Sequence, residues 1–152
     1  MRVSQFKDRV DSLLAQALLD LSMTLAVLAR IENNNFEIVA VQSNSGAYVP
    51  GEKFELGDSY SREVFEKQKI IAETNIDNSA HILLHPLYRA LPLESYIGAP
   101  ITADGEPWGC LDFSSMAQHD KAFSERDLKL VETLASEISQ LLSYTVTRAA
   151  VL

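Results

Sequence analysis

The sequence predicts an α+β domain in which a helix at each end of the chain frames an antiparallel sheet. Two observations carry this prediction. The first and last segments repeat apolar residues at three- and four-residue spacing, and the segments between them alternate β-branched or aromatic runs with turn residues. With 152 residues the chain is long enough to bury a full core, so we expect a single domain over residues 1–152.

Charge and composition narrow the class of protein. The net charge is -8, and residues 51–120 hold five basic and twelve acidic side chains, which argues against binding a nucleic-acid backbone. No apolar run approaches the roughly 18 residues that cross a bilayer, and Met1–Asp11 has no signal-peptide pattern. A lone cysteine, Cys110, excludes an internal disulfide. We therefore expect a cytoplasmic protein without membrane or nucleic-acid partners.

The N-terminal segment is predicted to be an amphipathic helix followed by a strand hairpin. Met23–Ile31 and Phe36–Val41 are apolar and partly β-branched, and the Asn-rich residues 32–35 between them tolerate the positive φ of a tight turn. The apolar stripe of the helix consists of Val3, Phe6, Val10, Leu13, Leu14, Ala17, Leu18 and Leu21.

The middle of the chain is predicted to contain a loop, a short helix and a short strand. Ser43–Gly57 is rich in glycine and is expected to be the loop. Asp58 or Ser59 then caps a helix that continues to Gln68. Lys69–Glu73 is the expected strand.

The second half is predicted to be a mixed segment, a second hairpin and a final helix. Thr74–Leu93 combines helical and loop signals and is broken by prolines. Tyr96–Thr102 and Trp108–Ser114 are strands joined by an Asp-Gly turn. Ser124 caps the last helix, with Asp127 three residues on. Its apolar positions are Leu128, Val131, Leu134, Ala135, Ile138, Leu141 and Leu142.

Five blocks of sequence, in order along the chain, resemble those of one family. They are Gly51–Ser61, His85–Tyr88, Leu93–Ile101, Gly105 with Trp108–Ser115, and Phe123 with Asp127. Together they resemble GAF domains fused to bacterial sensor kinases and cyclases, and the match spans nearly the whole chain.

The resemblance implies both an architecture and a class of function. It implies a central antiparallel sheet of five or six strands, with the terminal helices on one face and short helices and loops forming a pocket on the other. It also implies a sensory or regulatory domain that binds a small molecule and transmits through its terminal helices, often as a homodimer. An effector domain or a partner kinase or cyclase would receive the signal. The alternative is a ligand-free dimerisation module of a larger signalling protein.

The pocket that the resemblance implies would be lined by six residues. They are Tyr60, Ser61, His85, Tyr88, Tyr96 and Asp112. Asp112 is of special interest because strand alternation places Cys110, Asp112 and Ser114 on one face, and a carboxylate in a central strand is costly unless it is paired. Two interpretations stay open: Asp112 lines the pocket, or it pairs locally with a hydroxyl or a backbone N–H.

The chain departs from its relatives at several of these positions. Members of the group often carry a cysteine where this chain has Ser61, and commonly Thr and Asn where it has Cys110 and Asp112. Because Cys110 lies within a predicted strand, we expect no covalently attached bilin. A lone cysteine also cannot run the thiol–disulfide cycle of GAF-type reductases of free methionine sulfoxide. We therefore expect no cofactor, no catalytic residues and no enzymatic activity.

Two motifs have the spacing of catalytic or metal sites. Asp77, His81 and His85 are spaced by four residues, as ligands on one helix face would be, but Pro86 disfavours helical geometry at His85 and a fourth ligand is lacking. A polar loop is the better interpretation, and no metal is expected. Ser59 follows Gly57 as in some esterases, but without a base it is better explained as a helix cap.

Overall fold

The computed structural model describes residues 2–43, 46, 48–57, 59–74, 95–115 and 122–146. The elements in chain order are α1 (Val3–Leu21), β1 (Leu25–Glu32), β2 (Asn35–Ser43), β3 (Lys53–Glu55), α2 (Tyr60–Lys67), β4 (Ile71–Glu73), β5 (Ser95–Ala103), β6 (Glu106–Ser115) and α3 (Glu125–Val146). The strands form one six-stranded antiparallel sheet in the order β3-β2-β1-β6-β5-β4. The predicted α+β class is confirmed.

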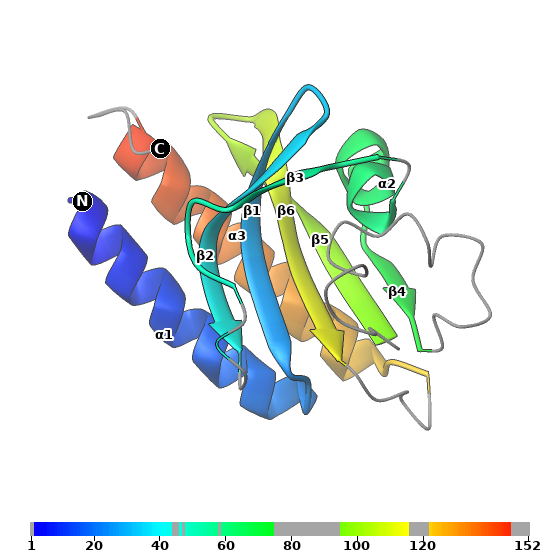
Figure 1. The fold of residues 1–152 in the computed structure, drawn as a ribbon. Coiled ribbons are helices and arrows are strands. Elements are labelled where there is room, and N and C mark those ends of the chain that lie inside the picture. Colours follow the sequence, from blue (N-terminus) through cyan, green and yellow to red (C-terminus); the bar gives the residue numbers. More distant parts are fainter. Residues whose placement is uncertain are drawn as a thin grey trace.

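The two terminal helices lie side by side on one face of the sheet, whereas α2 lies on the other (Figure 1). Helix α1 ends at Leu21 because Ser22 adopts a left-handed conformation with φ 55°. Helix α3 begins with the predicted reciprocal cap: the Asp127 N–H donates to Ser124 Oγ at 3.1 Å, and the Ser124 N–H donates to Asp127 Oδ2 at 3.0 Å. Within the described ranges, no helix is long and apolar enough to cross a bilayer.

Both predicted hairpins form, with tight turns at the expected residues. Asn33 has φ 58° in the β1–β2 turn, and Asp104 and Gly105 have φ 52° and 80° in the β5–β6 turn. The first strand begins at Leu25 instead of Met23, and the second extends to Ser43.

The prediction of one continuous loop over Ser43–Gly57 is wrong, since β3 lies within it and pairs with β2. Strand β3 has only three residues and lies between Gly51 and Gly57, so its alternating pattern is too short to recognise in the sequence. The strand expected at Lys69–Glu73 shortens to Ile71–Glu73 because Gln68, with φ 51°, ends α2 in a left-handed turn. Most of the mixed segment Thr74–Leu93 lies outside the described residues.

The sheet separates two hydrophobic clusters. The first packs β-strand residues such as Leu111 and Phe113 against α1 and α3, and the second packs Val27, Ile38 and Cys110 against α2. The predicted alternation along β6 is therefore confirmed, because Cys110 and Leu111 belong to opposite faces. The α2 face is also where most of the predicted site residues lie.

Candidate functional site

A buried carboxyl group, Asp112, is the centre of the α2 face. Its side chain is 1% exposed and accepts three hydrogen bonds. The Tyr96 hydroxyl donates to Oδ1 at 2.5 Å, the Ser61 hydroxyl donates to Oδ2 at 2.9 Å, and the Cys110 thiol donates to Oδ2 at 3.2 Å. Three elements, α2, β5 and β6, therefore meet at one acidic side chain.

Helix α2 holds Ser61 against Asp112 because two sets of hydrogen bonds fix the N-terminus of the helix. The Ser59 hydroxyl accepts the Arg62 N–H at 3.2 Å, as an N-cap does. The Arg62 guanidinium donates to the Gly57 carbonyl and to Asn34 Oδ1 in the β1–β2 turn. The predicted cap at Ser59 is confirmed, and the helix start is also tied to the β1–β2 turn.

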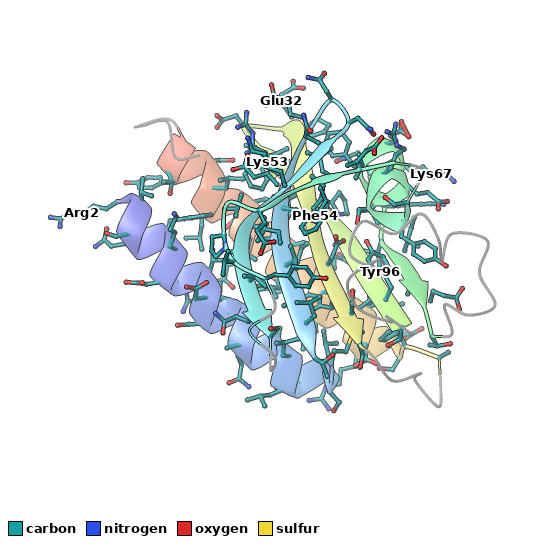
Figure 2. All side chains as sticks on the ribbon, in the orientation of Figure 1. Arg2, Glu32, Lys53, Phe54, Lys67 and Tyr96 are labelled. Carbon is teal, nitrogen blue, oxygen red and sulfur yellow. The ribbon has the colours of Figure 1, made fainter. Side chains whose placement is uncertain are left out.

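An aromatic pair borders the carboxyl group. The rings of Tyr60 and Tyr96 stack with centroids 5.2 Å apart and an interplanar angle of 19°. Tyr96 lies on the sheet face that α2 covers (Figure 2). Because Tyr60 and Ser61 are neighbours in the first turn of α2, this one turn contacts both Tyr96 and Asp112.

Burial controls the protonation of this cluster. Burial raises the pKa of Asp112, although the hydrogen bonds from Tyr96, Ser61 and Cys110 act in the opposite direction. The pKa values of Tyr96 and Cys110 lie well above their ordinary range, because both groups are buried and both face the Asp112 charge. Tyr96 and Cys110 are consequently neutral donors at neutral pH.

The structure brings together four of the six predicted site residues: Tyr60, Ser61, Tyr96 and Asp112. The other two, His85 and Tyr88, lie outside the described residues, as do Asp77 and His81 of the candidate metal motif. The pairing of Asp112 with hydroxyls matches the local-pairing interpretation and leaves ligand contact as a proposal. Among the residues that the structure describes, no group of three His, Cys, Asp or Glu side chains could hold a metal ion.

Gly98 is a site residue that the sequence prediction missed. It lies opposite Asp112 in the β5–β6 ladder, and a Cβ there would lie 2.1 Å from the Tyr96 hydroxyl oxygen. Glycine therefore makes room for the Tyr96–Asp112 hydrogen bond. A glycine in the interior of a strand is the signal that points to such a close approach.

Two open grooves lie on the other side of the molecule, along α3. One, of about 880 Å³, runs between α3 and β5 and includes Pro100, Ser139 and Tyr144 in its lining. The other, of about 460 Å³, runs between α1 and α3 and includes Leu13 and Leu130. These grooves lie beside the predicted output helices, whereas the Asp112 cluster is closed by its own side chains.

The cluster contains two side chains of nucleophilic type, Ser61 and Cys110. The Ser61 hydroxyl donates to Asp112 Oδ2 at 2.9 Å, and the Tyr96 hydroxyl lies nearer to the same carboxyl group, at 2.5 Å from Oδ1. Cys110 is buried and protonated, which is the opposite of a reactive thiolate.

Comparison with known proteins gives one family. Residues 5–143 match the model of the GAF domain family. A search of curated proteins finds no match.

Solved structures share the fold at low identity. The GAF domain of a phosphoenolpyruvate-protein phosphotransferase from Coxiella burnetii has a TM-score of 0.78 and 16% identity, covering 94% of this chain and 85% of its own. A phycocyanobilin-bound GAF domain from a cyanobacterial phytochrome has a TM-score of 0.74 and 14% identity, and the match covers 95% of this chain and 88% of the other. A type II free methionine-R-sulfoxide reductase from Thermoplasma acidophilum has a TM-score of 0.72 and 17% identity, and the match covers 93% of this chain and 95% of the other. At these identities the likeness concerns the fold alone.

Proposed function

The chain belongs to the GAF domain family, and on that premise we propose that it is a regulatory domain that binds a small molecule on the α2 face and signals through α1 and α3. The observation that carries the proposal is the buried polar cluster around Asp112. An ionisable group is expensive in a core, where an apolar side chain would pack at less cost. Its presence beneath α2 supports a recognition site.

The proposed ligand contacts are the predicted ones. The four described members of the set provide a carboxyl group from Asp112, three hydroxyl groups and the stacked Tyr60–Tyr96 pair. This is the mixture of apolar walls and few polar groups that small-molecule sites use. His85 and Tyr88 complete the proposed set. A ligand that takes over a hydrogen bond of Asp112 would release Ser61 and change the position of α2, so it would favour one of two arrangements.

Strand β5 offers a route from this cluster to α3. It carries Tyr96 on the α2 face, and farther along the strand the Thr102 N–H donates to Ser139 Oγ at 3.1 Å. The Asp104 N–H then donates to Ser143 Oγ at 2.8 Å. These two bonds hold α3 against the strand edge, beyond the residues that pair with β4. A displacement of β5 would therefore also displace α3.

We also propose a non-catalytic role in a cytoplasmic homodimer. Thiol–disulfide chemistry is disfavoured, because the chain has one cysteine and burial keeps Cys110 protonated. The dimer would form through α1 and α3, whose shared groove exposes part of Leu13 and Leu130. An effector domain or a partner kinase or cyclase would receive the signal.

A thermal-shift screen tests the sensory role. The protein is melted with cyclic nucleotides, amino acids and other metabolites, and a ligand at 100 times its Kd should stabilise it by about 2.7 kcal/mol. The shift should shrink in Tyr96→Phe and persist in Arg9→Ala, which removes an exposed ion pair between α1 and α3. A screen without any shift, together with a stable dimer, would contradict the proposal.

One observation favours the alternative of a ligand-free dimerisation module. Tyr60, Ser61, Tyr96 and Asp112 are each at most 3% exposed and are paired with one another. In that case the cluster is a polar core that fixes α2, and the oligomeric state would not respond to any metabolite.

A further inference from the structure

Ser114 carries a buried hydroxyl group that has no hydrogen-bond partner among the described residues. Its side chain is 1% exposed, and its Oγ atom bonds to none of them. Unpartnered buried hydroxyls are uncommon in folded proteins because each loses its bonds to water without replacement. The hydroxyl group of Ser114 therefore calls for an explanation.

Ser114 belongs to the Asp112 site. Its neighbours across the ladder are Leu25 in β1 and Tyr96 in β5, and both belong to the cluster on the α2 face. Asp112 lies two residues away on the same strand and the same face, about 7 Å along the strand. The unpartnered hydroxyl group and the buried carboxyl group thus lie on the sheet face that α2 covers, with Tyr96 opposite Ser114 in the ladder and hydrogen-bonded to Asp112.

The carboxyl group at this site has only neutral partners. Its three donors are two hydroxyls and a thiol, and no Lys, Arg or His of the described ranges bonds to it. The two cationic side chains of α2 are engaged elsewhere, Arg62 with Gly57 and Asn34, and Lys67 with Glu63. A carboxylate has about four acceptor sites, so one remains on Oδ1.

We propose that the ligand of this site carries a protonated amine or amidine that donates to both Asp112 and Ser114. One N–H would take the remaining acceptor site of Oδ1, a second would satisfy Ser114 Oγ, and the charge would balance the carboxylate. The adjacent Tyr60–Tyr96 stack adds aromatic surface, which attracts cations. This inference rests on the proposed function, since it names the chemical class of the ligand and adds Ser114 to its contacts.

Ser114→Ala gives a test with two opposite expectations. Without ligand, the variant should melt a few degrees above the wild type, because it removes an unsatisfied hydroxyl group from the core. With ligand, it should bind about tenfold more weakly, because a charge-assisted hydrogen bond is lost. Ser115→Ala is the matched control: Ser115 is the next residue on β6, has contacts of its own and belongs to the opposite side of the strand, so it should not change binding.

The probes are pairs that differ in charge but not in shape. Benzamidine is compared with benzamide, and 2-phenylethylamine with 2-phenylethanol, by melting temperature and by NMR titration of the folded protein. We expect the cation of each pair to bind at least tenfold more tightly at pH 7, and we expect Asp112→Asn to abolish the preference. If Asp112→Asn does not fold, the Ser114→Ala result decides.

The outcomes separate this inference from the proposed function. Equal binding of charged and neutral probes overturns the inference, and so does the absence of binding by either cation. The proposed function stands in both cases if another metabolite in the wider screen binds and its binding depends on Tyr96. Destabilisation of the free protein by Ser114→Ala would also count against the inference, because it would show that the hydroxyl group is satisfied without a ligand.

Discussion

Gly98 faces Asp112 across the β5–β6 ladder, and the missing side chain at Gly98 is what lets Tyr96 reach the carboxyl group. A Cβ at position 98 would lie 2.1 Å from the Tyr96 hydroxyl oxygen and 2.8 Å from Asp112 Oδ1. Tyr96 is fully buried, so its ring has no free space into which it could retreat. The hydrogen bond and the glycine therefore depend on each other.

Gly98→Ala should destabilise the protein by about 3 kcal/mol or more, because it adds a clash to a packed core and breaks the Tyr96–Asp112 bond. Chemical denaturation measures the change. Gly46→Ala is the control: its Cβ meets nothing within 4 Å, and only its φ of 65° opposes the substitution. We expect a cost of about 1 kcal/mol there. Equal costs at both glycines would show that crowding at Asp112 is unimportant.

Tyr96→Phe and Ser61→Ala each remove one donor from Asp112, and each should cost about 2 kcal/mol of unfolding free energy. Both donors bond to one carboxyl group. The loss of unfolding free energy in the double variant should therefore differ from the sum of the two single losses by about 0.5 kcal/mol or more, in either direction. Tyr144→Phe, at a residue that is 55% exposed, should stay within about 0.5 kcal/mol. Strict additivity would contradict a shared network.

How much of the structure the sequence predicts depends on how far apart along the chain the interacting residues lie. The terminal helices and the two hairpins depend on local periodicity and turn residues, so their patterns are visible in the sequence. Strand β3 depends on its pairing with β2, and its three residues carry no pattern of their own. Ser61 and Asp112 lie 51 residues apart in the chain. The family resemblance implies that both line a pocket, but only the fold shows that they form a hydrogen bond with each other.

The stability of the protein should depend on pH through Asp112. Burial raises the pKa of Asp112 above its ordinary value of 3.8, so the folded protein keeps this proton at pH values where the unfolded chain has released it. The stability that Asp112 contributes is therefore greatest below pH 3.8 and is lost as the pH rises through the folded pKa. The wild type should lose stability relative to Asp112→Asn over that range.

The control for this measurement is Asp11→Asn on α1. The pKa of Asp11 is also raised, first by burial and then by the Asp8 charge, so it contributes a dependence of the same sign at a distance from the site. Comparing both variants with the wild type separates the two contributions. If the wild type gained stability relative to Asp112→Asn as the pH rose, the hydrogen bonds would outweigh burial and the carboxyl would be ionised more easily than in water.

The serines of α3 should protect the edge of β5 from exchange with water. Ser139→Ala leaves the half-buried Thr102 N–H without its acceptor and should cost about 1 kcal/mol, while Ser143→Ala should cost less because Asp104 is exposed. Amide hydrogen exchange should accelerate at Thr102 and Asp104. Ser136→Ala, an exposed position on the same helix, should leave both amides unchanged. Unaltered exchange in the first two variants would remove the proposed link from β5 to α3.

The groove between α1 and α3 should be the dimer interface. Leu13 and Leu130 are only partly buried in it, and its rim carries acidic and basic side chains from Asp20, Glu137, Arg126 and Lys129. A two-fold copy could therefore cover the leucines and place opposite charges against each other. Leu130→Glu introduces a charge on both sides of the symmetry axis and should convert a dimer to a monomer at micromolar concentration, which light scattering measures. Leu19→Glu changes a residue that is 75% exposed and does not line the groove, so it should remain dimeric. A monomeric wild type, or a Leu130→Glu protein of unchanged mass, would place the interface elsewhere or exclude it.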